Sequence, residues 1–169
     1  MGNIKKGDQL VIILRKTTIT DIPRIYENLH LHYVEKYCKN EKEKQWDLHN
    51  KWYRFLINSP TYKLYTVEDM RKEFIGTVMF ELQEEIGVIS IFLVPKARHR
   101  GYSPILINAS IEELKFENPE ISLVLAYILE ENENSQGAFK KAGFIPDGTE
   151  EYKGVEHLLF MKIIEKGHD

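Results

Sequence analysis

The spacing of apolar residues predicts a strand and two helices in the first third of the chain. The apolar run 10–14, followed by Arg15 and Lys16, predicts a first strand. Apolar residues at helical spacing from Ile22 onward predict a helix over 22–37, and a second helix ends near residues 58–60. The second helix is marked by Trp46, His49, Trp52, Tyr53, Phe55 and Leu56.

The middle of the chain contains three strand patterns followed by a glycine turn. Residues 62–67 and 74–82 predict a hairpin, and the apolar run 88–94 extends the same sheet. The strand stops at Pro95, which cannot continue a ladder of hydrogen bonds. Ser103 is placed as the N-cap of the next helix and Pro104 as its first residue.

That helix is predicted to pack on the sheet and to end at Asn118-Pro119. Its apolar positions are Ile105, Leu106, Ile107, Ala109, Ile111, Leu114 and Phe116. A buried strand over 122–129 and a short helix over 136–141, closed by a glycine at 143, come next. A hairpin of 148–154 and 155–164 completes the sheet, so the pattern predicts a mixed α/β (α+β) fold.

Length and composition favour one domain over residues 1–169, with loose ends at 1–7 and 166–169. The single cysteine, Cys38, cannot form an internal disulfide, and no apolar leader or spanning run is present. These features predict a soluble, cytoplasmic protein without membrane contact. The 23 basic and 26 acidic residues give a net charge of −3, which argues against nucleic-acid binding. No pattern suggests a metal site.

Two patterns carry candidate chemistry. Arg98-x-x-Gly101-x-Ser103 lies between a strand and a helix, where backbone amides bind anions such as phosphate. Taken alone, it could be an exposed basic turn. Asn132-x-x-Ser135-x-x-x-Phe139 leads to Gly143-Phe144 after a buried strand and could, taken alone, be only a capped helix. Both patterns occurring in this order are unlikely to be accidental.

With these two patterns, nearly the whole chain resembles the GCN5-related N-acetyltransferase family, whose cradle for acetyl-coenzyme A has the form Arg/Gln-x-x-Gly-x-Gly/Ala. The resemblance implies a mostly antiparallel twisted sheet with a splayed parallel pair and helices on both faces. It implies acetyl-coenzyme A as the donor and no metal. The implied coenzyme-binding residues are Ile91, Phe92, Leu93, Arg98, His99, Arg100, Gly101, Tyr102, Ser103, Asn132, Ser135 and Phe139.

The chain departs from the family pattern at three positions. Ser103 replaces a glycine or alanine, which preserves a small residue at the cradle. Phe139 stands where many relatives carry a tyrosine that protonates the leaving thiolate, and phenylalanine has no proton to give. Without that tyrosine, water, the substrate ammonium, Tyr127 or Tyr152 must protonate the thiolate, or it leaves unprotonated. Tyr127 itself stands where many relatives carry a glutamate base.

Acetyl transfer to an amine also needs a stabilised oxyanion and, for a basic amine, a proton acceptor. The backbone N–H of Leu93 is the expected oxyanion donor. His49, Glu81 and Glu85 are the candidate bases, with His49 placed first because its ordinary pKa suits proton transfer. The alternative is that both glutamates are solvated turn charges and that His49 is a helix-face residue.

The spacing Trp46-x-x-His49-x-x-Trp52-Tyr53 is similar to that of family members that acetylate nucleotide-linked amino sugars, as in pseudaminic-acid-type and spore-coat pathways. A seam of core aromatics explains the same spacing. The leading hypothesis is therefore a small-molecule acceptor, namely an amino-sugar nucleotide. The alternatives are a protein N-terminus, as in ribosomal-protein acetyltransferases, and a non-catalytic acyl-coenzyme A-binding module. Edge strands near the C-terminus could pair two subunits in a homodimer.

Overall fold

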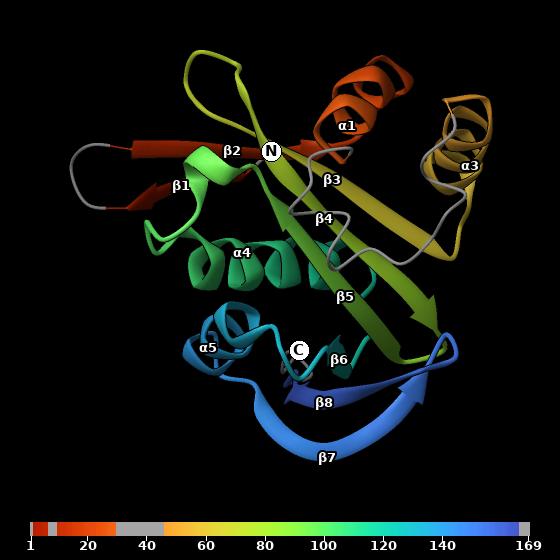
Figure 1. The fold of residues 1–169 in the computed structure, drawn as a ribbon, viewed down its shortest axis with the longest axis vertical. Helices are drawn as coiled ribbons and strands as arrows, with labels where there is room; N and C mark the ends of the chain where they lie inside the picture. The colour runs from red at the N-terminus through yellow and green to blue at the C-terminus, as the bar shows by residue number, and fades with distance from the viewer. Residues whose placement is uncertain (1, 7–9, 30–45, 166–169) are drawn as a thin grey trace.

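The computed structural model describes residues 2–6, 10–29 and 46–165 (Figure 1). Its strands are β1 (Gly2–Lys6), β2 (Leu10–Lys16), β3 (Tyr62–Glu68), β4 (Phe74–Gln83), β5 (Ile86–Leu93), β6 (Leu123–Ile128), β7 (Ile145–Tyr152) and β8 (Val155–Ile163). Its helices are α1 (Ile22–Leu29), α3 (Trp46–Asn58), α4 (Tyr102–Glu117) and α5 (Glu133–Lys141), with 3₁₀ turns η1 (Ile19–Asp21) and η3 (Pro95–Ala97).

The eight strands form one sheet in the order β1-β2-β3-β4-β5-β6-β8-β7. The seven pairs of neighbouring strands are antiparallel except for β5–β6, which is parallel. The β5–β6 ladder is short, because only residues 86–88 pair with residues 123–125. Beyond this point the two strands diverge, which is the predicted splayed parallel pair in a mostly antiparallel sheet.

Helices cover both faces of the sheet, as Figure 1 shows. The side-chain position of Gly87 lies next to the side chains of both Phe80 and Leu114, and Leu114 belongs to α4. Phe80 therefore points to the face of the sheet that α4 covers. Glu81 follows Phe80 on β4 and therefore points to the opposite face, where its cross-strand partner Tyr62 contacts two aromatic rings of α3. The α+β architecture predicted from the sequence is confirmed.

Most element boundaries follow the apolar pattern within a few residues, but four expectations are wrong. Residues 2–6 are not a loose end, because they pair antiparallel with β2 as strand β1. Ser103 is not an N-cap: α4 begins at Tyr102, and Gly101 occupies the cap position. Helix α5 begins at Glu133, three residues before the expected start, since Asn132 caps it. Phe116 does not pack on the sheet, because 84% of it is exposed.

Several expectations fall outside the described residues. The first helix is confirmed over Ile22–Leu29, and its predicted continuation to residue 37 lies beyond this range. Cys38 with the charged run that it begins, and the C-terminal residues 166–169, also lie outside it.

Candidate active site

The divergence of β5 from β6 exposes main-chain groups of β5. The amide of Val94 donates to the carbonyl oxygen of Ile75 at 2.9 Å, so these two residues are a hydrogen-bonded pair. Hydrogen-bonded and non-hydrogen-bonded pairs alternate along an antiparallel ladder, and the next pair, Gly76 with Leu93, is therefore non-hydrogen-bonded. The N–H and C=O of Leu93 consequently point away from β4, toward the side from which β6 has diverged. Its N–H therefore lies on the side required of the predicted oxyanion donor.

Gly76 permits the close approach of β4 to this part of β5. A side chain at position 76 would clash with the carbonyl oxygen of Phe92 on the neighbouring strand. Glycine at this position keeps the strands paired up to Leu93, where the splay is fully open.

The turn after β5 leads directly into the start of α4. Its backbone has positive φ at His99 (58°) and at Gly101 (72°), and Gly101 offers no side chain to cap the helix. The first amides of a helix lack partners within the helix, so those of α4 are available to an anion. Arg98 ties the turn to β5, since its Nε donates to the carbonyl oxygen of Leu93 at 2.8 Å.

Helix α5 forms the opposite side of the site. The Oδ1 of Asn132 accepts a hydrogen bond from the amide of Ser135 at 3.2 Å, which is the N-cap interaction that this sequence favours. At the other end of the helix, Nζ of Lys162 donates to the carbonyl oxygen of Ala142 and to Oδ1 of Asn108, each at 2.7 Å. Lys162 thus joins the C-terminal end of α5 to α4.

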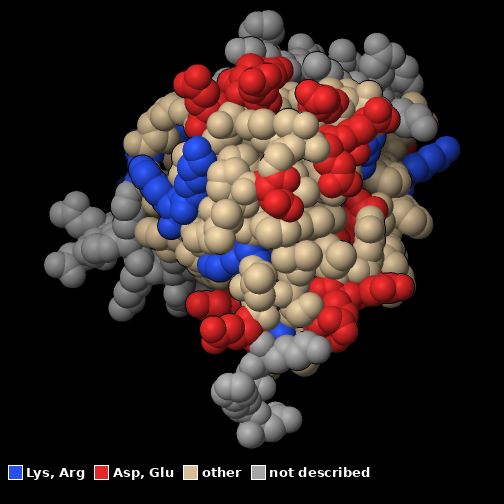
Figure 2. Space-filling model, turned by 90° about the horizontal axis from the view of Figure 1, so that it is seen from below, with Lys and Arg blue, Asp and Glu red and all other residues tan. Residues whose placement is uncertain are grey.

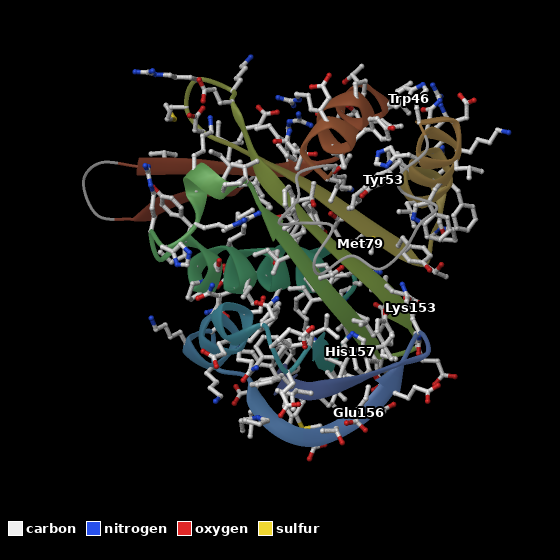
Figure 3. All side chains as sticks on the ribbon, in the orientation of Figure 1. Trp46, Tyr53, Met79, Lys153, Glu156 and His157 are labelled. Carbon is white, nitrogen blue, oxygen red and sulfur yellow. The ribbon has the colours of Figure 1, made fainter. Side chains whose placement is uncertain are left out.

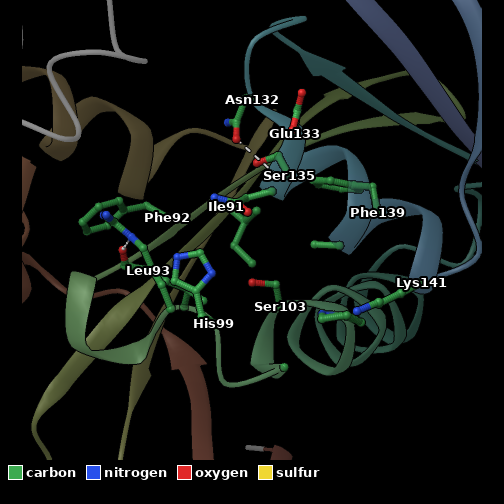
Figure 4. Close-up of a pocket in the computed structure, with 16 residues that line it drawn as sticks. Ile91, Phe92, Leu93, His99, Ser103, Asn132, Glu133, Ser135, Phe139 and Lys141 are labelled. Atoms are coloured by element: carbon green, nitrogen blue, oxygen red, sulfur yellow. Dashed lines mark hydrogen bonds between the residues drawn. The ribbon is translucent and has the colours of Figure 1, made fainter.

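Between these elements lies an open pocket of about 370 Å³ (Figure 4). It contains ten of the twelve residues predicted to bind the coenzyme: Ile91, Phe92, Leu93, Arg98, His99, Gly101, Ser103, Asn132, Ser135 and Phe139. Arg100 and Tyr102 do not line it. The residues that the sequence analysis missed are Pro104, Glu133, Asn134, Gly137, Ala138 and Lys141. The helical period of α5, counted from Asn134, would have indicated most of them.

Phe139 lies in the wall of this pocket without a polar group to offer. It is only 2% exposed, and its ring meets that of Phe144 edge to face at 5.0 Å between centroids. The pair anchors α5 in the core. Phe139 is therefore a packing residue and offers no proton donor at this position.

Basic groups concentrate on the side of the molecule that holds α5. In Figure 2, Lys and Arg side chains gather on the left, the side on which α5 lies in Figure 1, and acidic side chains occupy other parts of this face. The last turn of α5 carries Lys140 and Lys141, and Lys141 lines the pocket together with Arg98 and His99. The pocket is thus suited to an anionic ligand.

A second group of polar and aromatic side chains lies on the α3 side of the sheet, where β5 and β6 part. We name it the tyrosine–carboxylate cluster, and it consists of Tyr62, Glu81, Tyr127, Glu150, Tyr152 and His157. Glu81 faces Val88, the last residue of β5 that pairs with β6, and Tyr127 follows the end of that pairing on β6. The cluster therefore borders the splay.

Contacts within this cluster are continuous from β4 to β8. The rings of Tyr127 and Tyr152 stack with centroids 4.1 Å apart, and His157 meets both rings edge-on. The Tyr152 hydroxyl donates to Glu81 and the Tyr127 hydroxyl to Glu150, each at 3.4 Å. In Figure 3, His157 lies toward the β7–β8 turn.

Both phenols of the stacked pair remain protonated at neutral pH. Burial and the nearby carboxylate of Glu81 raise the pKa of Tyr152 to about 12. Burial and then the charge of Glu150 raise the pKa of Tyr127 as well. Each phenol is consequently a hydrogen-bond donor beside an acceptor carboxylate.

The structure separates the other two candidate bases from this cluster. Glu85 lies in the β4–β5 turn, where its carboxylate accepts from the Ser122 hydroxyl at 3.1 Å. His49 is completely buried in α3 and stacks on Tyr53 at 4.3 Å, with Tyr26 of α1 edge-on at 4.8 Å. Figure 3 shows Tyr53 on the α1 side of α3. Neither His49 nor Glu85 lines the pocket.

We expect His49→Ala to act on stability. Removing a buried ring from the α1–α3 contact leaves a cavity, so the free energy of unfolding should fall by about 2–4 kcal/mol. Urea unfolding measures this loss, and the pH dependence of turnover by the folded fraction should stay that of the unaltered chain. A shifted pH dependence of turnover with unchanged stability would instead indicate that His49 takes part in the reaction.

Comparison with known proteins identifies the family. The model of the acetyltransferase (GNAT) domain matches residues 12–145, which is most of the chain. The chain therefore belongs to the GNAT acetyltransferase family, and it is an acetyl-coenzyme A-dependent N-acetyltransferase. No curated protein matches it in sequence.

Solved structures share the fold at low sequence identity. The aminoglycoside acetyltransferase AAC(6′)-Ib, in complex with ribostamycin and coenzyme A, is 18% identical with a TM-score of 0.80; the match covers 90% of this chain and 93% of that one. Spermidine N-acetyltransferase from Vibrio cholerae, in complex with coenzyme A and spermine, is 19% identical with a TM-score of 0.79, over 92% and 96% of the two chains.

The described part of the chain has neither a membrane-spanning helix nor a metal-binding group of side chains. None of its helices has the length and apolar character needed to cross a membrane. Within the same residues, His, Cys, Asp and Glu form no group of three or more that could hold a metal ion.

Proposed function

We propose that this acetyltransferase modifies a primary amine of a small, multiply cationic molecule that binds at the tyrosine–carboxylate cluster. The observation that carries the proposal is the pairing of Glu81 and Glu150 with Tyr152 and Tyr127 beside the splay. Carboxylates attract ammonium groups, and tyrosine rings accept both cations and the apolar faces of sugars. Aminoglycosides and spermine, which two structural neighbours bind, have this character.

The same charges argue against the nucleotide-linked amino sugar expected from the sequence. The diphosphate of a sugar nucleotide would face Glu81 and Glu150, and like charges repel. Lys153 lies over the ring of Tyr152 at 5.2 Å, but its single positive charge does not balance the two carboxylates. An amino sugar without the nucleotide keeps the aromatic contacts and avoids this repulsion.

The arrangement assigns a part in the reaction to each side of the splay. On the α5 side, the α4 amides and the pocket of Ile91, Leu93 and Asn132 would hold acetyl-coenzyme A. On the α3 side, Glu81 would accept a proton from the amine through a chain of bound waters, as the amine nitrogen attacks the thioester carbonyl. The Leu93 N–H would stabilise the oxyanion until the C–S bond breaks. Phe139 gives the thiolate no proton, so Tyr127, Tyr152 or water must supply it.

A panel of acceptors tests this proposal by release of the coenzyme A thiol. We expect ribostamycin or spermidine to give a kcat/KM at least about tenfold above that of a 4-amino-sugar nucleotide or a peptide with a free N-terminus. Preference for the sugar nucleotide would reject the charge argument, and preference for the peptide would favour an N-terminal acetyltransferase. Coenzyme binding without thiol release for any amine would indicate a non-catalytic binding module.

The role of Glu81 gives a separate prediction. Glu81→Gln keeps an acceptor for the Tyr152 hydroxyl but removes the base, so kcat/KM should fall about 10²-fold and its pH profile should lose the limb that reports a base. Glu85→Gln is the matched control, since Glu85 lies in the adjoining turn and outside the cluster. Equal activities of the two variants would remove Glu81 from the mechanism.

A further inference from the structure

We propose that Gly137 and Lys141 of α5 form a subsite for the 3′-phosphate of coenzyme A. This inference rests on the proposed placement of the coenzyme in the pocket between α4 and α5. It goes further by assigning a phosphomonoester to particular residues and by predicting selectivity for coenzyme A over its 3′-dephospho form.

The residues of α5 that line the pocket follow one face of the helix. Asn134, Gly137, Ala138 and Lys141 are spaced by three and four residues, and all of them border the cavity. Gly137 and Lys141, four residues apart, are direct neighbours on this face. Whatever binds along α5 therefore meets both of them.

Gly137 leaves free space where any other residue would place a side chain. A Cβ built there would have no heavy atom within 4 Å. Glycine inside a helix is less favourable than alanine, and its φ here is not in the left-handed region that would require glycine. No contact within the protein explains this glycine, whereas a ligand passing close to the helix would.

Lys141 supplies the charge at the end of this free space. Helical side chains tilt toward the N-terminus of their helix, so the stem of Lys141 leans toward Gly137. Within the described part of the chain, Lys141 forms no ion pair. Lys140 is different, because it lies over the ring of Phe160 at 6.0 Å and does not line the pocket.

The direction of the pocket favours the 3′-phosphate over the pyrophosphate as the partner of Lys141. Asn132 and Ser135, at the start of α5, lie beside the β5 strand that would hold the thioester arm, and Lys141 follows Ser135 by about 9 Å along the helix. The amides at the start of α4 serve the pyrophosphate. In Figure 4, Ser103 of that helix start lies between His99 and Lys141. The remaining anion of the coenzyme is its 3′-phosphate.

Titration calorimetry with coenzyme A and 3′-dephospho-coenzyme A tests the subsite. We expect the unaltered protein to bind coenzyme A about tenfold more tightly, as for a charge-assisted pair near the surface. Lys141→Ala should reduce this preference to less than about twofold by weakening coenzyme A alone, and Lys141→Arg should retain most of it. Lys140→Ala, which removes the same charge from the neighbouring position, should keep the full preference.

Gly137→Ala provides an independent variant that should not lose its fold. It should raise the melting temperature of the free protein and weaken coenzyme A binding several-fold, because the new methyl group enters the ligand space. Equal affinity of the unaltered protein for both ligands, equal effects of Lys140→Ala and Lys141→Ala, or unchanged affinity of Gly137→Ala would overturn the subsite. Failure of both ligands to bind would instead overturn the placement of the coenzyme in this pocket.

Discussion

Replacing Gly101 with glutamate is expected to raise the dissociation constant for acetyl-coenzyme A at least about 100-fold. Gly101 precedes the first residue of α4 and lines the pocket, so the new side chain would place bulk and negative charge where the pyrophosphate meets the helix amides. Loss of one or two charge-assisted hydrogen bonds accounts for a change of this size. Isothermal titration calorimetry measures it directly.

The control for this variant is the same substitution at Gly154. Gly154 lies in the β7–β8 turn with φ of 78°, close to the 72° of Gly101, and it does not line the pocket. Because both glycines have left-handed backbone, glutamate at either position should cost about 1–2 kcal/mol of stability. Only Gly101→Glu should lose coenzyme binding. Retained affinity in that variant would contradict the assignment of the turn as the pyrophosphate cradle.

Replacing Asp21 with alanine should lower the free energy of unfolding by about 3–5 kcal/mol. The Asp21 carboxylate is buried and accepts hydrogen bonds from Arg15 at 2.7 and 2.8 Å and from Arg24 at 2.8 Å. Glu68 on β3 joins the same two arginines. Loss of Asp21 leaves these partly buried guanidinium groups with one carboxylate between them. Denaturant unfolding at neutral pH gives the difference.

The same cluster makes stability depend on pH in the acid range. Burial would raise the pKa of Asp21, but hydrogen bonds from Arg15, the Thr18 amide and Arg24 outweigh it and hold the pKa well below its usual value. Glu68 shows the same balance, and its pKa is also lowered. The unfolded chain therefore binds these protons first, so the stabilisation is complete above about pH 4–5 and is lost as pH falls below that. Asp21→Ala should flatten this part of the profile.

An exposed ion pair supplies the comparison for Asp21. Lys16 and Glu117 approach to 3.0 Å, but the Lys16 side chain is 70% exposed. Lys16→Ala should therefore change stability by less than about 1 kcal/mol. If Asp21→Ala were equally mild, the buried cluster would not be what fixes η1 and α1 to β2 and β3.

The fold and most of the residues that line the pocket were predictable because their signals are local. Apolar runs of the right length located β2 through β6, and the expected starts of the two helices that border the pocket, at Pro104 and at residue 136, lie two and three residues after the observed ones. Ten of the twelve expected coenzyme residues line the pocket for the same reason, since a turn and a helix cap are short-range structures.

The expectations that failed depended on partners distant in sequence. Residues 2–6 form a strand only because β2 offers an edge, and the exposure of Phe116 depends on how α4 is rotated against the sheet. His49 lies at helical spacing from two tryptophans, which cannot distinguish a pocket from a core. The packing of α3 against α1 places it in the core.

By itself, the sequence determined the order of the elements, the family and the acetyl donor. These depend on residues close together along the chain, namely those of a strand, a glycine turn, a helix start and a capped helix. Only the tertiary structure joined Glu81, Tyr127, Glu150 and Tyr152, which come from the three separate strands β4, β6 and β7 and meet beside the splay. It also distinguished Lys141 from Lys140, since the rotation of α5 decides which of two adjacent lysines borders the pocket. Long-range packing carries this information, and no spacing along the chain contains it.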